Sequence, residues 1–398
     1  MKEINLDYAA AAPVDSVVLD AMLPFFTEYY GNPSSGHKLG EKPRKALEEA
    51  RKNVALLIGA QPAEIIFTAS ASEANNLAIK GIVKAGKKKG NHIIASSIEH
   101  FSVLNQLKTL QKEGFTVTLL PVDRYGIVNP DHLAAEITDK TILVSIQLAN
   151  PEIGTIQPID QLTALTREKG IPFHTDAAAA AGWIPIDVDK MGIDLLTMAG
   201  DQFYGPKGSG ALYVRRGVRV SPIIEGGIQE KGLRAGTENV ALAVGLGEAA
   251  RLAYEAMPER PNKIVAIRDK LKESLFESIP QLHLNGHPEK RLPHNLNISV
   301  EFVEGEALLM RLEMAGIYVS SGSSCTSQAL KSSHVLTAIG VPPELAQGSL
   351  LLTLGVESNV EDIPYITDKL AQVSELLRNM SPLYHKYLKE GNNNARVQ

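Results

Sequence analysis

The chain has 398 residues, of which 44% are hydrophobic and 21% charged, and its formal net charge is −5. This length accommodates a large domain and a smaller one. The slightly acidic charge and the lack of a basic stripe give no reason to expect a nucleic-acid partner. No apolar run reaches membrane-spanning length and the N-terminus lacks the layout of a signal peptide, so we expect a cytoplasmic protein.

From about residue 42 the sequence alternates between helical and strand patterns. Apolar residues at 47, 50, 54, 57 and 58 predict a helix over 42–58. A strand over 65–68 then enters a turn at 69–72, and a helix over 73–83 follows; the basic run 87–89 is predicted to end this helix and face solvent. Apolar, β-branched runs predict strands at 92–96, 115–120, 141–148 and 171–175, with an antiparallel return strand at 210–215. Continuous apolar strands are typical of a parallel sheet covered on both faces.

The pattern changes after two predicted helices over 239–256 and 262–278. Strands at 295–300 and 349–354 and helices at 304–315 and 360–377 indicate a smaller α+β unit. We therefore predict a large domain over 16–257, and a small domain formed by 1–15 and 258–398. The polar tail 390–398 is expected to be frayed.

Cys325 is the only cysteine, which excludes an intramolecular disulfide and a metal site built from several cysteines of one chain. A lone cysteine is usually a small buried apolar residue. This one lies in the segment Ser320–Lys331, SSGSSCTSQALK, whose small polar residues do not suit a core. We therefore predict a solvent-accessible thiol on a loop.

Three further residues are candidates for a site. The turn at 69–72 precedes a helix, so its backbone N–H groups and the Ser72 hydroxyl could receive a phosphate. Ser72 could equally be a helix cap, and the residues alone leave both readings open. Asp176 ends a predicted strand, a common place for functional residues in α/β sheets. His100, taken alone, is more often structural.

Five motifs follow one another along the chain: Leu6–Val14, Gly31–His37, Phe67–Asn76, Arg234–Asn239 and the cysteine loop. Taken in order, they resemble the cysteine desulfurases of the NifS/IscS type, which are fold-type I pyridoxal-phosphate (PLP) enzymes of the class V aminotransferase family. The resemblance extends to about Tyr384. It implies an α/β, PLP-transferase architecture with a mostly parallel sheet flanked by helices, plus a smaller α+β domain. It also implies a homodimer.

The resemblance implies a role for each candidate residue. PLP would be the cofactor, with its phosphate at Ala71 and Ser72 and, from the partner subunit, at Thr237. Asp176 would pair with the pyridinium nitrogen, which makes the ring an electron sink. His100 would stack on the ring as a catalytic residue. Cys325 would be the other catalytic residue, taking sulfur from cysteine as a persulfide and passing it to a scaffold protein.

The sequence departs from the family pattern where the cofactor and substrate are held. Gln202 stands where the family has the Schiff-base lysine, and an amide nitrogen cannot form an imine. Lys207 matches the family's second lysine, which faces away from the imine. The other departures are Asp201 for histidine, Ala199 for serine, Ala179 for glutamine, Pro151 for asparagine, and Leu351 for an arginine that clamps carboxylates. Each lost charge-assisted hydrogen bond is worth roughly 1.5–3 kcal/mol, so we expect PLP to bind poorly.

Three functions remain open. The lost ligands favour a desulfurase-like protein of iron–sulfur cluster assembly that presents Cys325 to a scaffold protein of the IscU type. There Cys325 would be a sulfur carrier or a ligand of a 2Fe–2S cluster shared with the partner. The alternative is an active PLP-dependent desulfurase that converts L-cysteine to L-alanine and persulfide sulfur. The third is a pseudo-enzyme that regulates a true desulfurase through mixed dimers.

Overall fold

The structure is a computed structural model that describes residues 2–321 and 333–395. Its centre is a seven-stranded sheet with the strand order β2-β8-β7-β6-β5-β3-β4. Only β8 runs antiparallel to its neighbours, which confirms the predicted parallel sheet and return strand. The strands are β2 (Ile65–Thr68), β3 (His92–Ser96), β4 (Thr116–Leu120), β5 (Thr141–Ser145), β6 (Phe173–Asp176), β7 (Leu195–Ala199) and β8 (Gly210–Val214).

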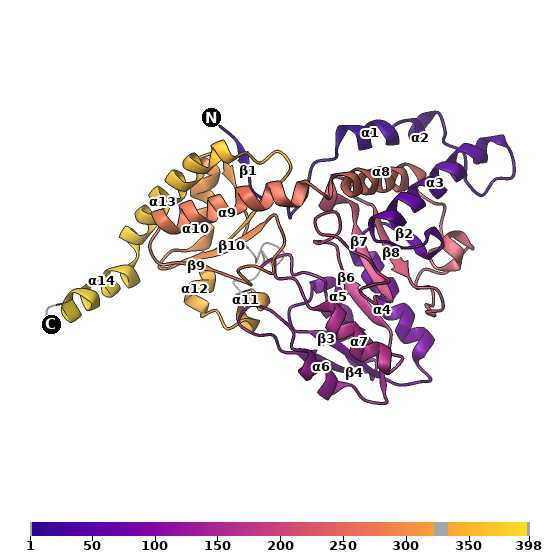
Figure 1. The fold of residues 1–398 in the computed structure, drawn as a ribbon, viewed down its shortest axis with the longest axis horizontal. Coiled ribbons are helices and arrows are strands. Elements are labelled where there is room, and N and C mark those ends of the chain that lie inside the picture. The colour runs from indigo at the N-terminus through magenta and orange to yellow at the C-terminus, as the bar shows by residue number, and fades with distance from the viewer. Residues whose placement is uncertain (1, 322–332, 396–398) are drawn as a thin grey trace.

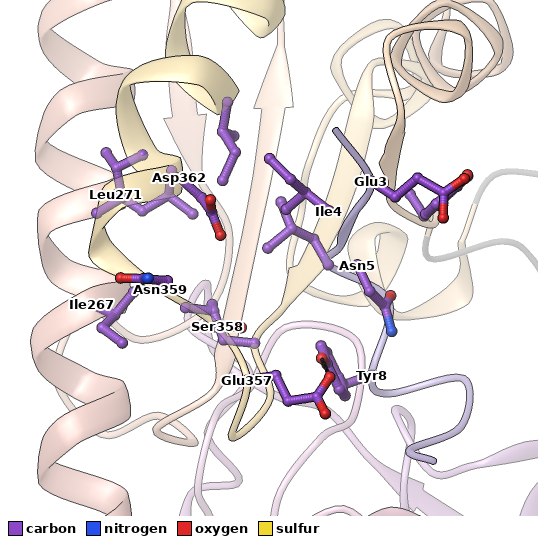
Figure 2. Close-up of a pocket in the computed structure, with 15 residues that line it drawn as sticks. Glu3, Ile4, Asn5, Tyr8, Ile267, Leu271, Glu357, Ser358, Asn359 and Asp362 are labelled. Atoms are coloured by element: carbon purple, nitrogen blue, oxygen red, sulfur yellow. Dashed lines mark hydrogen bonds between the residues drawn. The ribbon is translucent and has the colours of Figure 1, made fainter. Parts of the chain in front are cut away.

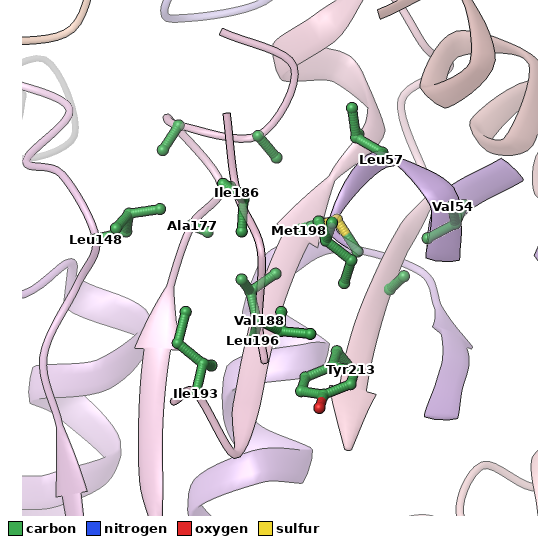
Figure 3. Close-up of a cluster of buried hydrophobic side chains, with 14 of the residues drawn as sticks. Val54, Leu57, Leu148, Ala177, Ile186, Val188, Ile193, Leu196, Met198 and Tyr213 are labelled. Atoms are coloured by element: carbon green, nitrogen blue, oxygen red, sulfur yellow. The ribbon is translucent and has the colours of Figure 1, made fainter. Parts of the chain in front are cut away.

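Helices cover both faces of this sheet (Figure 1). Successive strand residues point to opposite faces, so Ile93 and Leu195 join one buried cluster while Ile94 and Leu196 join another. The first cluster packs against α4 (Ala71–Gly86) and α5 (Phe101–Lys112). The second, partly shown in Figure 3, packs against α3 (Lys38–Leu57), α6 (Pro130–Glu136), α7 (Ile159–Glu168) and α8 (Val240–Ala256). The basic run 87–89 follows the end of α4 and is exposed, as predicted.

A three-stranded antiparallel sheet, in the order β12-β10-β9, forms the second part of the fold. It consists of β9 (Leu282–Leu284), β10 (Asn295–Val300) and β12 (Ser349–Thr353), and packs with α9 (Arg260–Ser278), α10 (Gly305–Met314) and α13 (Ile363–Met380). The N-terminal β1 (Ile4–Asn5) pairs in parallel with β11 (Ile317–Tyr318), and its neighbours Leu6 and Tyr8 join the same core. We retain the division after residue 257 as a proposal.

Figure 2 shows a cleft of about 290 Å³ in this second part, where Ile4 of β1 faces Leu271 of α9. Several short helices connect the larger elements. They are α1 (Ser16–Met22), α2 (Pro24–Thr27), α11 (His334–Ala338), α12 (Pro343–Gln347) and the 3-10 turns Pro62–Glu64, Gly200–Phe203, Gln229–Gly232 and Val360–Asp362. No helix in the described part of the chain is long and apolar enough to cross a membrane.

The C-terminal end differs from the sequence prediction. The chain forms α14 over Pro382–Ala395, so fraying from residue 390 is wrong as far as Ala395. The ring of Phe302 lies 5.6 Å from that of Tyr384 and 5.0 Å from that of Tyr387. These contacts fix the first turns of α14, and further turns then add at little cost because helix propagation is easier than nucleation.

Candidate functional site

A cavity of about 340 Å³ lies at the carboxyl ends of the strands of the large sheet, where α/β folds generally bind ligands. Short segments that end or follow the strands form one wall. The other wall comes from the N-terminal segment, α11 and β12. The lining residues are Ser70–Ser72, Ile98–Phe101, Gln147, Ala149–Glu152, Asp176, Ala178, Ala179, Ala199, Asp201, Gln202, Asp7, Ala9, Ala10, Ser320, Ser321, His334, Val335 and Leu351.

The structure brings most of the sequence-predicted residues together here. Ala71, Ser72, His100, Asp176 and Gln202 all line the cavity. Thr237 does not line it in the described chain; it is exposed in the loop before α8. Its predicted role in a partner subunit's site remains a prediction. Cys325 lies outside the described residues.

The beginning of α4 shows which serine caps the helix. The cap is Ser70, whose Oγ accepts a hydrogen bond from the Glu73 backbone N–H at 3.1 Å. Glu73 in turn accepts one from the Ala69 N–H at 2.9 Å. Ser72 is therefore not needed as a cap. The first N–H groups of a helix have no acceptor within it, so the backbone at Ala71 and Ser72 suits an anion.

Asp176 is held in a fixed orientation at the end of β6. One carboxylate oxygen accepts a hydrogen bond from Asn75 Nδ2 at 2.7 Å, and the other accepts one from the Ala178 N–H at 3.0 Å. Asn75 also donates to Ser102 Oγ at 2.8 Å. Sequence reasoning missed Asn75, although an asparagine on the apolar face of a helix is a signal for such a role.

His100 has a structural role whatever its chemistry. It is the N-cap of α5, and its Nδ1 accepts a hydrogen bond from the Ser102 N–H at 3.1 Å. In the neutral ring this acceptor role leaves the proton on Nε2. The ring centroids of Phe101 and His334 lie 4.8 Å apart beside it.

The Gln202 side chain is tied to the N-terminal segment. Its Nε2 donates a hydrogen bond to the Ala9 carbonyl at 3.1 Å, and its backbone carbonyl accepts one from Trp183 Nε1 at 2.9 Å. The pKa of the neighbouring Asp201 is raised by burial, an effect that the charge of Lys207 partly offsets. Lys207 itself is exposed and is not among the described residues that line the cavity.

The other five residues that the sequence analysis interpreted as departures from the family pattern line the same cavity: Ala199, Asp201, Ala179, Pro151 and Leu351. Four of these side chains are apolar and one is acidic. The wall that they form therefore offers no positive charge to a phosphate or a carboxylate.

Two buried glutamates complete the site, and sequence reasoning missed both. Glu99 is fully buried, and one of its oxygens accepts hydrogen bonds from Ser96 Oγ and from the Gln147 N–H. Its other oxygen, and one oxygen of Glu152, have no hydrogen-bond partner. Burial raises the pKa of Glu99 to about 8 and that of Glu152 to about 7.

Comparison with known proteins gives one consistent result. Residues 4–364 match the family Aminotransferase class-V. The chain is 50% identical over 385 residues to a cysteine desulfurase IscS of Methanosarcina thermophila, covering 97% of this chain and 95% of the relative. It is 49% identical over 390 residues to a cysteine desulfurase IscS of Clostridium botulinum, covering 98% of each.

Solved structures of similar proteins lead to the same family. A NifS-like protein superposes with a TM-score of 0.89 at 35% identity, covering 94% of this chain and all of that protein. This similarity confirms the α/β, fold-type I architecture that the resemblance implied.

The raised pKa of Glu99 makes a testable prediction about stability. Between pH 4.5 and about 8 the unfolded chain loses this proton while the folded chain retains it, so wild-type stability falls as pH rises through that window. Glu99→Gln removes the titrating carboxyl group and with it this dependence of stability on pH. The melting temperature of the variant, relative to that of the wild type, should therefore rise from pH 5 to pH 8. The corresponding change in the difference between their free energies of unfolding is on the order of 4 kcal/mol.

The matched control is Glu277→Gln, because Glu277 is exposed on α9. Its difference from the wild type should not vary with pH. A constant difference for Glu99→Gln as well would show that Glu99 is ionised in the folded protein.

Proposed function

The chain belongs to the aminotransferase class-V family, and on that premise we propose that it serves iron–sulfur cluster assembly by presenting Cys325 to a scaffold protein, without imine chemistry at residue 202. Cys325 acts there as a sulfur carrier or as a cluster ligand. The observation that carries the proposal is that Gln202, whose side chain ends in a carboxamide, lines the same cavity as Asp176, Ser72 and His100. A carboxamide has no nucleophilic nitrogen for an aldehyde.

The residues of the cavity only partly suit PLP. The beginning of α4 would receive its phosphate, and the carboxylate of Asp176, which lines the cavity, would pair with a pyridinium nitrogen. When bound in such a site, PLP supplies an electron sink. Against this stand the carboxamide of Gln202 and the apolar and acidic side chains at 199, 201, 179 and 151. We infer that PLP is held weakly and without a covalent bond.

The partner follows from the number of thiols. An iron–sulfur cluster usually takes four thiolate ligands, and this chain has one cysteine. A cluster that includes Cys325 needs its other ligands from another protein. A scaffold protein of iron–sulfur assembly has the matching chemistry, and a homodimer would place Thr237 at a second subunit's cavity.

An active cysteine desulfurase is the second candidate. About half of the residues, over almost the whole chain, are identical to those of proteins named cysteine desulfurase, and this similarity favours the second candidate. The fixed carboxylate of Asp176 also favours it. It requires cofactor attachment that does not use residue 202.

The two candidates differ in cofactor binding and turnover. We expect no internal-aldimine absorbance when PLP is added to the purified protein, and no catalytic sulfide release from L-cysteine. Gln202→Lys should restore at most a small activity, because Asp201, Pro151, Ala179 and Leu351 remain. The measurements are the visible absorption spectrum and a sulfide assay under reducing conditions. Robust turnover by the wild type would establish the desulfurase instead.

The role of Cys325 is tested with a scaffold protein, ferrous iron and sulfide. We expect the mixture to assemble a cluster on the complex, and Cys325→Ser to change its absorption and electron paramagnetic resonance spectra because one thiolate ligand is lost. Ser323→Ala, two residues away, is the control and should leave the spectra unchanged. Identical spectra for Cys325→Ser and the wild type would rule out a ligand role.

A further inference from the structure

Two residues that line the cavity, Asp176 and His100, are joined by a chain of hydrogen bonds through residues outside its lining. Asn75 of α4 donates through Nδ2 to Asp176 Oδ2 at 2.7 Å and to Ser102 Oγ at 2.8 Å. Ser102 is in the first turn of α5, and its Oγ lies 2.8 Å from His100 Nδ1. The connection therefore runs from the end of β6, through α4, to the ring at the beginning of α5.

The direction of each hydrogen bond in this chain follows from the donors and acceptors involved. A carboxylate oxygen only accepts hydrogen bonds, so the Asn75 atom beside Asp176 is the amide nitrogen, which has two hydrogens to donate. The second hydrogen goes to Ser102 Oγ. His100 Nδ1 accepts the Ser102 backbone N–H at 3.1 Å, so it carries no proton and the Ser102 hydroxyl donates to it as well. The donors thus point away from Asn75, to Asp176 on one side and to His100 on the other.

Burial keeps this arrangement in place. Asn75 is 0% exposed, so water cannot replace either of its partners, and losing one would leave a buried polar group unpaired. The buried Gln106 holds the next part of the chain, because its Nε2 donates to the Ser102 carbonyl at 2.7 Å. Asparagine is otherwise a poor choice inside a helix, since its side chain favours caps and turns. One hydrogen bond would satisfy Asp176 Oδ2, and the second one, to Ser102, extends the contact to His100.

We propose that Asn75 and Ser102 are positioning residues that couple Asp176 to His100 and hold the proton of the neutral His100 ring on Nε2. Nδ1 accepts both the backbone N–H and the hydroxyl of Ser102, so Nε2–H is the polar group that the ring has left for a ligand in the cavity. Hydrogen bonds in a chain polarise one another, so donation by Asn75 strengthens donation by Ser102 and makes Nε2–H a better donor.

The coupling determines which ligand atoms His100 can receive. A ligand that approaches Nε2 must present an acceptor atom there, such as a carbonyl, carboxylate or phosphate oxygen. A ligand with only donors at this position gains no hydrogen bond from the ring. The inference goes beyond the presentation of Cys325 and applies to either of the two candidate functions.

The test is the ¹⁵N NMR spectrum of the full chain labelled with ¹⁵N-histidine, recorded at about pH 8.5, where an imidazole is ordinarily neutral. His100→Gln identifies the His100 signals among those of the ten histidines. We expect a protonated Nε2 and an unprotonated, hydrogen-bonded Nδ1. Ser102→Ala should shift the Nδ1 resonance toward that of a ring nitrogen without a hydrogen bond. Ser102→Thr keeps the hydroxyl and should leave the resonance near its wild-type position.

Asn75→Leu, which is of similar size, tests the longer connection, because Asn75 acts on His100 only through Ser102. It should shift the Nδ1 resonance in the same direction as Ser102→Ala, but by less, since the hydroxyl is retained. Asn76→Ala is the matched control. Asn76 is the next residue of α4 and donates only to the Ser72 carbonyl within the helix, so this variant should have the wild-type His100 signals.

A neutral ring with its proton on Nδ1, or an Nδ1 resonance that Ser102→Ala leaves unchanged, would overturn the proposal. An Nδ1 resonance unchanged in a folded Asn75→Leu variant would also overturn it, since Asn75 would then support Asp176 alone. Circular dichroism checks the fold, and Asn75→Ala takes the place of Asn75→Leu if leucine does not fit. Sulfide release from L-cysteine would refute the proposed function without bearing on the His100 tautomer, so the two proposals can fail separately.

Discussion

The convergence of the strand ends on one edge of the central sheet is the constraint on which the site depends. Strands β2, β3, β5, β6 and β7 run in the same direction, so the segments that end or follow them meet at their carboxyl ends. The beginning of α4 lies at the same edge and adds its free N–H groups. Residues as far apart in the chain as Ser72, Asp176 and Gln202 thereby line one cavity.

The cavity combines firmly held groups with a lining that includes no lysine or arginine among the described residues. Asp176 accepts hydrogen bonds from Asn75 and Ala178, and Ser70 caps α4. Yet the positions at which the family resemblance expects lysine, histidine and arginine are Gln202, Asp201 and Leu351. Burial raises the pKa of Glu99 and that of Glu152, and both residues line the cavity. A lining rich in carboxyl groups weakens the case for an anionic cofactor.

Sequence reasoning predicted those features that local pattern determines. The bounds of β2, β3 and β10 follow from short apolar runs, and the antiparallel direction of β8 from the tight turn that precedes it. The site residues that the family resemblance implied, apart from Thr237 and Cys325, line one cavity. Asn75, Glu99 and Glu152 were missed because their burial arises only when distant segments close over them. The extent of α14 was missed for a similar reason, since contacts of Phe302 with Tyr384 and Tyr387 support a helix whose own sequence is polar.

The central claim is that residue 202 forms no covalent bond with PLP and that no other residue replaces it. Borohydride reduction in the presence of PLP converts any imine to a stable amine, which intact-protein mass spectrometry and peptide mapping then locate. Under limiting PLP, we expect no adduct on a peptide from the cavity, and Gln202→Lys as the positive control should give one at residue 202. A stoichiometric adduct in the wild-type chain that maps to a single lysine, and that L-cysteine prevents, would contradict the account.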